Sequence, residues 1–209
     1  MAFVMANLIL LLISFYFVYR IDALSSLIQL KESRVALHLF AGSTLTLSLL
    51  AILSGGISPQ MPLHFMGIAA ITLIIGYRLS VTAALIVIGV QFSIGKLQFD
   101  VLGISLFCGS LLPIMLLQYW VRLTQRSNIW FFTFITAGLG SLLLFVAKTL
   151  GMASYYYWVL QLDSAQIIAQ YILVSSLFWV PEILLSVTII LTCLQHRPQW
   201  VACFEQSPN

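Results

Sequence analysis

Long apolar runs dominate the chain, and short stretches that contain charged residues, proline or glycine separate them. A run of about 20 apolar residues crosses the ~30 Å hydrocarbon core of a bilayer as a helix. The pattern therefore predicts an all-α integral membrane protein with a single polytopic membrane domain over residues 1–209. The expected helices are Ala2–Tyr19, Val35–Ile57, Phe65–Tyr77, Leu79–Gly95, Val101–Val121, Ile129–Leu150 and Ile167–Leu194.

The third expected helix, Phe65–Tyr77, is too short for an untilted span. It either extends into the preceding loop or stops part-way and is covered by neighbouring helices. Arg78 decides how the region is divided, because one long helix over 65–95 would leave its guanidinium in lipid. We therefore expect about seven transmembrane helices.

Basic residues concentrate at alternate ends of these helices, which predicts an orientation. With an external N-terminus, seven of the nine Lys and Arg residues face the cytoplasm. These seven are Arg20, Lys31, Arg34, Arg78, Arg122, Arg126 and Arg197. Because cytoplasmic loops carry an excess of Lys and Arg, we expect a multi-pass protein of the cell (inner) membrane, with its C-terminus in the cytoplasm.

Composition excludes several classes of protein. Hydrophobic residues make up 61% of the chain and charged residues 7%, against about 25% charged in soluble domains. No basic run could neutralise successive phosphates, so the expected partner is the lipid bilayer and not nucleic acid. The three cysteines show no metal-ligand spacing and are expected to be free thiols.

Tyrosine and tryptophan residues gather near the predicted helix ends. Tyr155, Tyr156, Tyr157 and Trp158 are consecutive and follow the sixth expected helix after a gap of four residues. We expect this cluster to lie in the last outer loop and to anchor the chain at the headgroup layer, where such rings are enriched.

Glu182 is the ionisable residue placed deepest in an expected helix, and it follows Pro181. A proline at that point frees a backbone carbonyl one turn earlier, which makes the position polar and kinked. Glu182 could ligate a cation, relay protons or form a structural pair with Lys148 on the preceding helix. Lys148 could also extend to the membrane surface.

The expected outer loop before the third helix holds a second group of candidate residues. Met61, His64 and Met66 bring two thioethers and an imidazole together within six residues. Such soft ligands suit a transition-metal ion of the copper type, although loop residues of this kind also occur simply at the interface. No motif of a hydrolase or metalloprotease is present, so we expect no enzyme, and any ATPase would be a separate chain.

Three segments share their order and approximate spacing with a known family. They are His64–Gly67 followed by Gly76, Leu102–Gly109 followed by Pro113, and Val180–Leu185. In these segments the chain resembles the CbiM/NikM family, the substrate-capturing membrane components of energy-coupling factor transporters for cobalt and nickel. The resemblance covers about two thirds of the chain, Ser58–Leu194.

The resemblance implies a seven-helix permease component that works with a coupling membrane subunit and ATPases. The family binds its metal through the N-terminal amine, a second-position histidine and the histidine that matches His64. Ala2 stands at the second position here, so Met61 or Met66 would supply softer replacements.

The expected function is uptake of a small solute, a transition-metal ion of the cobalt or nickel type, with no covalently bound cofactor. The alternative is a non-transporting scaffold or assembly subunit on a degenerate carrier fold.

Overall fold

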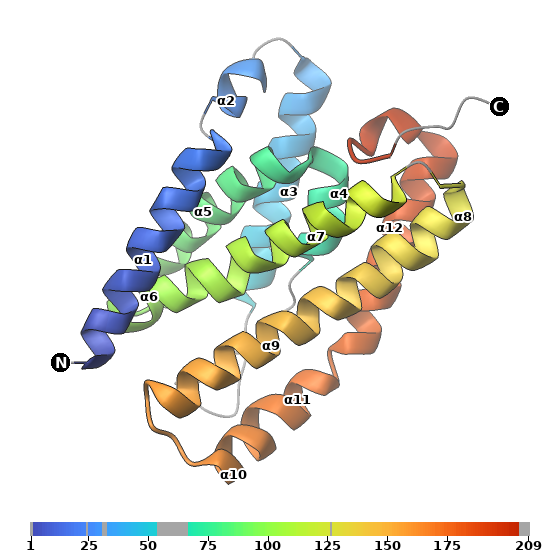
Figure 1. Cartoon of the computed structure of the whole chain (residues 1–209). Coiled ribbons are helices and arrows are strands. Elements are labelled where there is room, and N and C mark those ends of the chain that lie inside the picture. The colour runs from blue at the N-terminus through green and yellow to red at the C-terminus, as the bar shows by residue number, and fades with distance from the viewer. Residues whose placement is uncertain (1, 24, 31–32, 54–66, 126, 205–209) are drawn as a thin grey trace.

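The computed structural model describes residues 2–23, 25–30, 33–53, 67–125 and 127–204. Over these ranges the chain forms helices joined by short turns and contains no strand, which confirms the predicted all-α fold there (Figure 1). The helices are α1 (Ala2–Ile21), α2 (Ser26–Gln29), α3 (Arg34–Ile52), α4 (Ile68–Ile75), α5 (Tyr77–Ser93), α6 (Phe99–Leu106), η2 (Phe107–Leu111), α7 (Leu112–Thr124), α8 (Ile129–Phe131), η3 (Phe132–Leu139), α9 (Gly140–Trp158), α10 (Ser164–Ile167), η4 (Ile168–Ile172), α11 (Leu173–Ser176), α12 (Trp179–His196) and η5 (Pro198–Trp200).

Five helical stretches in the described part of the chain are long and apolar enough to cross a membrane. They are Val4–Ile21, Arg34–Ile52, Phe99–Thr124, Ile129–Trp158 and Ser164–His196. Their length and composition indicate a membrane protein. The expected count of seven spans is not confirmed, because α5 has 17 residues and α4 has eight.

Two glycines explain why α4 is short. Gly67 precedes it with a φ of 54°, and Gly76 follows it with a φ of 80°. Residues with a side chain rarely adopt such positive φ values, so glycine allows the backbone to turn sharply at both ends. Within the segment expected at Phe65–Tyr77, the described residues form a helix over Ile68–Ile75, and the next helix starts at Tyr77.

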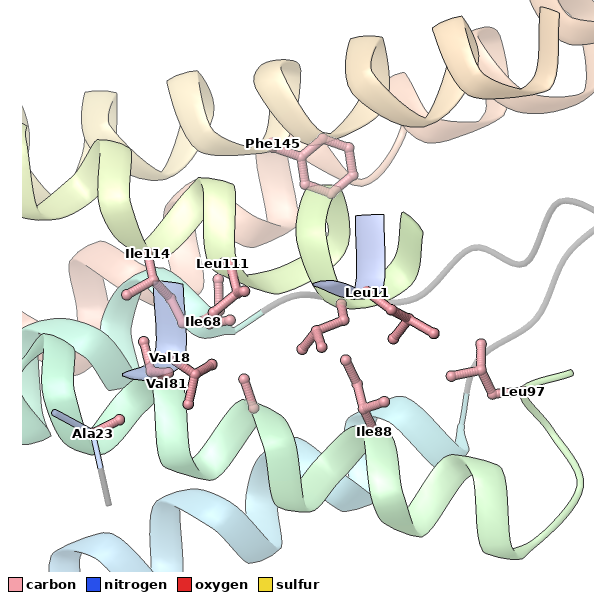
Figure 2. Packing of buried hydrophobic residues seen from close by; sticks show 12 residues of the cluster. Leu11, Val18, Ala23, Ile68, Val81, Ile88, Leu97, Leu111, Ile114 and Phe145 are labelled. Carbon is pink, nitrogen blue, oxygen red and sulfur yellow. The ribbon is translucent and has the colours of Figure 1, made fainter. Parts of the chain in front are cut away.

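Helix α4 lies at the centre of the bundle. Seven of its eight residues are buried, and α3, α5, α7, α9 and α12 all pack against it. Figure 2 shows Ile68, at the start of α4, near Val81 of α5, Leu111 of η2 and Ile114 of α7. Because neighbouring helices cover most of α4, it need not be long enough to cross a bilayer by itself.

The C-terminal segment holds the other end of α4. The last carbonyls of a helix have no partner within it. Here the N–H of Ala202 donates to the Ile74 carbonyl at 3.0 Å, and the N–H of Cys203 donates to the Leu73 carbonyl at 3.2 Å. Residues that follow the last helix thereby complete the hydrogen bonds of a helix in the middle of the sequence.

The first helix packs closely against α6, and the side chain of Asn7 makes a polar contact between the two helices. The Asn7 side chain donates to the Phe99 carbonyl at 2.8 Å and accepts from the Gly103 N–H at 2.7 Å. These two backbone groups are four residues apart, the pair that an α-helix normally joins. A Cβ on Gly103 would lie 2.3 Å from the Asn7 carbonyl oxygen, so only glycine permits this approach.

Helix α9 is longer than its sequence indicated, which corrects the position of the aromatic cluster. It continues to Trp158, so Tyr155, Tyr156 and Tyr157 lie on a helix and not in a loop. Tyr156 is 1% exposed, and its ring packs edge-on against Tyr171, with 5.2 Å between the ring centres. The anchor interpretation is wrong for Tyr155 and Tyr156, whose rings contribute to the core.

The helices run alternately up and down, and one end of the bundle gathers positive charge. Helices α1, α7 and α12 end there, and α3, α5 and α8 begin there (Figure 1). The arginines at these helix ends are Arg20, Arg34, Arg78, Arg122 and Arg197. We call this the basic end. Its concentration of arginine agrees with the predicted sidedness, whereas the orientation in a membrane stays a prediction.

Candidate functional site

Two interrupted helices meet at Glu182. The last span, Ser164–His196, is broken after Ser176, and α12 starts at Trp179 with Glu182 in its first turn. Pro181 has no N–H to donate to the carbonyl four residues earlier, which favours this break. The expected kink in one long helix is thus a new helix start, with Glu182 18 residues after the beginning of the span and 14 before its end.

The carboxylate of Glu182 caps the start of α4. Its Oε1 accepts a hydrogen bond of 2.7 Å from the N–H of Gly67. The first N–H groups of a helix lack partners within it and carry partial positive charge, so a carboxylate is favoured there. Helix α4 ends near the basic end, and its eight residues span about 12 Å. Gly67, at its start, therefore meets Glu182 inside the bundle.

Lys148 places a positive charge within electrostatic reach of this carboxylate. It attracts Glu182 from the neighbouring α9, and the two side chains are 5% and 2% exposed. Lys148 lies ten residues before the end of its span, a distance of about 15 Å along the helix. The structure therefore brings the predicted pair together and buries Lys148 in the interior of the bundle.

Further polar groups follow the same face of the last span. Ser175, Trp179 and Ser186 are spaced three to four residues from Glu182 or from one another, so they share its side of the helix. Their side-chain polar atoms, together with the hydroxyl of Thr72 on α4, are buried and have no hydrogen-bond partner. Such groups are rare in protein interiors. We call Glu182, Lys148 and these four residues the polar centre.

The predicted metal ligands Met61, His64 and Met66 lie outside the described residues. Gly67, which contacts Glu182, directly follows this segment in the sequence. Among the described residues there is no group of three or more His, Cys, Asp or Glu side chains that could hold a metal ion. Within the described residues, the charged groups of the polar centre are Glu182 and Lys148, a pair of opposite charges.

The polar centre also contains residues that the sequence did not single out. The two serines carry no sequence signal of their own in a chain rich in small residues. Gly67 belongs to a segment that the resemblance includes, but nothing in the sequence indicated its contact with Glu182. The spacing of Ser175, Glu182 and Ser186 along one helical face was the signal that could have found the serines.

Comparisons of the chain with protein-family models, with curated proteins and with solved structures give no match. The resemblance to the CbiM/NikM family thus rests on the short segments quoted above, and function has to be argued from the polar centre.

Proposed function

We propose that this chain is the permease component of an energy-coupling factor type transporter in the cell (inner) membrane, and that it takes up a small solute. The observation that carries the proposal is the meeting of two interrupted helices, α4 and α12, at a buried carboxylate. Interrupted helices near the middle of a bilayer build the binding sites of many membrane transporters, since their ends offer free backbone groups to a solute.

The charges of the polar centre support transport over a purely structural role. Burying Glu182 and Lys148 costs free energy that packed apolar residues would not cost. Buried ionisable groups in membrane helices usually belong to substrate or proton pathways. A carboxylate has about four lone-pair positions. Glu182 can therefore hold Gly67 and still interact with Lys148 and with an arriving solute.

The resemblance to the CbiM/NikM family supports a transition-metal ion of the cobalt or nickel type as the solute. In this proposal His64, with Met61 or Met66, captures the ion in the segment that precedes α4. Gly67 would then connect capture to the polar centre, because it directly follows that segment in the sequence and donates its N–H to Glu182. The metal is transported and is not a resident cofactor.

The proposal includes partner chains and excludes catalysis by this chain. A coupling membrane subunit would bind the bundle, and separate ATPase chains would supply energy, with the basic end in the cytoplasm. The chain itself would carry out no reaction.

Uptake of radioactive Co²⁺ and Ni²⁺ by cells that express the chain with its transporter partners tests the proposal. We expect His64→Ala and Glu182→Gln to lower uptake at least tenfold, with Asp163→Asn as the control, because Asp163 is an exposed carboxylate outside the polar centre. Elemental analysis of gently purified protein should show stoichiometric metal.

Two results would contradict this proposal. If His64→Ala keeps wild-type uptake of every divalent and monovalent metal tested, His64 does not capture the solute. If Glu182→Gln also keeps wild-type uptake and the protein co-purifies with other membrane proteins without metal, the scaffold alternative applies.

A further inference from the structure

A groove of about 280 Å³ runs along α4 between α3 and α12. Ile71 contributes to its floor, Gly42 to the α3 wall and Ile189 to the α12 wall. One end of the groove reaches Gly67, and the other reaches Trp200 near the basic end. Gly42 and Trp200 are exposed, so the groove opens to the outside of the bundle between two of its spans.

The chemistry of the groove changes along its length. The part along α4 is lined mainly by apolar side chains such as Ile71, Ile74 and Leu185, with Ser43 and Thr46 as polar members, while His38 and Trp200 lie toward the basic end. Arg34 precedes His38 by four residues and so shares its face of α3. Arg197 follows α12, and both arginines are exposed. An apolar slot thus leads to positive charge.

The surroundings of the groove indicate what fills it. Leu45 and Leu49 of α3 and Val180 and Leu184 of α12 are exposed apolar side chains, which face lipid when these helices span a bilayer. An empty slot would lose dispersion contacts with its lining. A volume of about 280 Å³ would hold less than one turn of an α-helix, which with its side chains is about 10 Å or more in diameter. A hydrocarbon chain is narrower and can enter a slot of this size.

We propose that this groove binds one acyl chain of an anionic phospholipid, with the headgroup at the basic end near Arg34, His38 and Trp200. Anionic headgroups are attracted by basic residues next to a membrane-spanning helix. The indole of Trp200 suits the headgroup layer because tryptophan is enriched at that depth. The bound chain would keep α3 and α12 apart over α4.

Native mass spectrometry of the purified protein with added dioleoylphosphatidylglycerol tests this site. A Cβ on Gly42 meets no atom within 4 Å, and the same holds for Gly89 on α5, which does not line the groove. We expect one tightly retained lipid in the wild type and in Gly89→Leu. Binding should be at least tenfold weaker in Gly42→Leu, whose side chain fills the slot.

Cys193 gives a second measurement that needs no change to the protein, because it lines the groove. We expect added phosphatidylglycerol to slow its alkylation by N-ethylmaleimide at least fivefold at pH 8. Cys203 is the internal reference, because it does not line the groove and burial raises the pKa of its thiol, which keeps the thiol in its unreactive protonated form at that pH.

Three outcomes would overturn the proposal. Equal retention of the lipid by Gly42→Leu and the wild type would place the lipid elsewhere. Equal retention of dioleoylphosphatidylcholine would remove the role of the basic end. Protection of Cys193 that depends on protein concentration and not on lipid would assign the groove to a second copy of the chain.

Discussion

Two polar contacts inside the bundle, the Asn7 contact between α1 and α6 and the polar centre around Glu182, differ in how completely their groups are paired. Both the donor and the acceptor of the Asn7 amide are bonded to the backbone of α6. In the polar centre one carboxylate oxygen caps α4, yet Ser175 and Ser186 on the same helical face have no hydrogen-bond partner.

The difference separates a contact that positions helices from one that has capacity to bind. A set of hydrogen bonds that reaches every polar atom of a contact fixes one geometry and leaves no atom without a partner. An incomplete set costs free energy in the protein alone, and that cost falls when a solute or water supplies the missing partners. Substitutions on each side of the comparison therefore predict different combinations of stability and uptake.

The largest effect is expected from removing one charge of the polar centre. Glu182→Leu leaves the buried ammonium of Lys148 without its opposite charge, which destabilises by about 3–5 kcal/mol in comparable buried pairs. The double variant Glu182→Leu with Lys148→Met should recover most of that stability, because both charges are gone, but it should not recover uptake. Unfolding in SDS and solute uptake, measured on the same preparations, check the two parts.

A double variant that is as unstable as Glu182→Leu would show that the two charges do not compensate each other. Asp163→Leu is the matched control, since this exposed carboxylate lies outside the spans and should change stability little.

The next effect concerns the paired contact. Gly103→Ala places a Cβ 2.3 Å from the Asn7 carbonyl oxygen, and backbone cannot move aside as a side chain can. We expect a loss of about 1–3 kcal/mol in SDS unfolding, typical of overpacking. Gly89→Ala is the control, because its Cβ meets nothing within 4 Å. Equal stability of the two variants would contradict the close approach of α1 to α6.

A smaller effect is expected for Asn7→Leu. The variant loses two buried hydrogen bonds, but Phe99 and Gly103 are four residues apart and can pair with each other along α6. We expect a loss of about 1–2 kcal/mol. Uptake per folded molecule should match the wild type, because Asn7 positions α1 and lies outside the polar centre. Reduced uptake at unchanged stability would contradict the comparison.

Much of the fold could be predicted from the sequence, because a helix that crosses a bilayer needs about 20 apolar residues. Apolar runs of sufficient length predicted all five candidate spans, and the glycines and short length of Phe65–Tyr77 allowed a helix that stops part-way. The run of four aromatic residues misled, because their apolar rings suit a core as well as an interface. Only packing against Tyr171 distinguishes the two environments.

Of the polar centre, only the two charged residues could be predicted from the sequence. A carboxylate beside a proline in an apolar run is conspicuous, and so Glu182 and Lys148 were found. The hydrogen bond from Gly67 joins residues 115 positions apart, and no local pattern reports such a contact. The hydrogen bonds that Ala202 and Cys203 donate to the end of α4 also join residues far apart in the sequence.

The smallest change in stability, and the sharpest test of the comparison, is expected for Ser186→Ala. Because the hydroxyl of Ser186 is buried without a partner, its removal should leave stability unchanged or raise it by up to about 1 kcal/mol. A solute or water that uses the hydroxyl would lose one hydrogen bond, so the concentration for half-maximal uptake should rise about two- to tenfold. Ser154→Ala is the control, since this exposed hydroxyl donates to the Leu150 carbonyl of its own helix at 2.8 Å. Equal uptake by both serine variants would mean that the unpaired groups around Glu182 are structural. The Asn7 contact and the polar centre would then differ in how many of their polar atoms are hydrogen-bonded, but both would serve only to position helices.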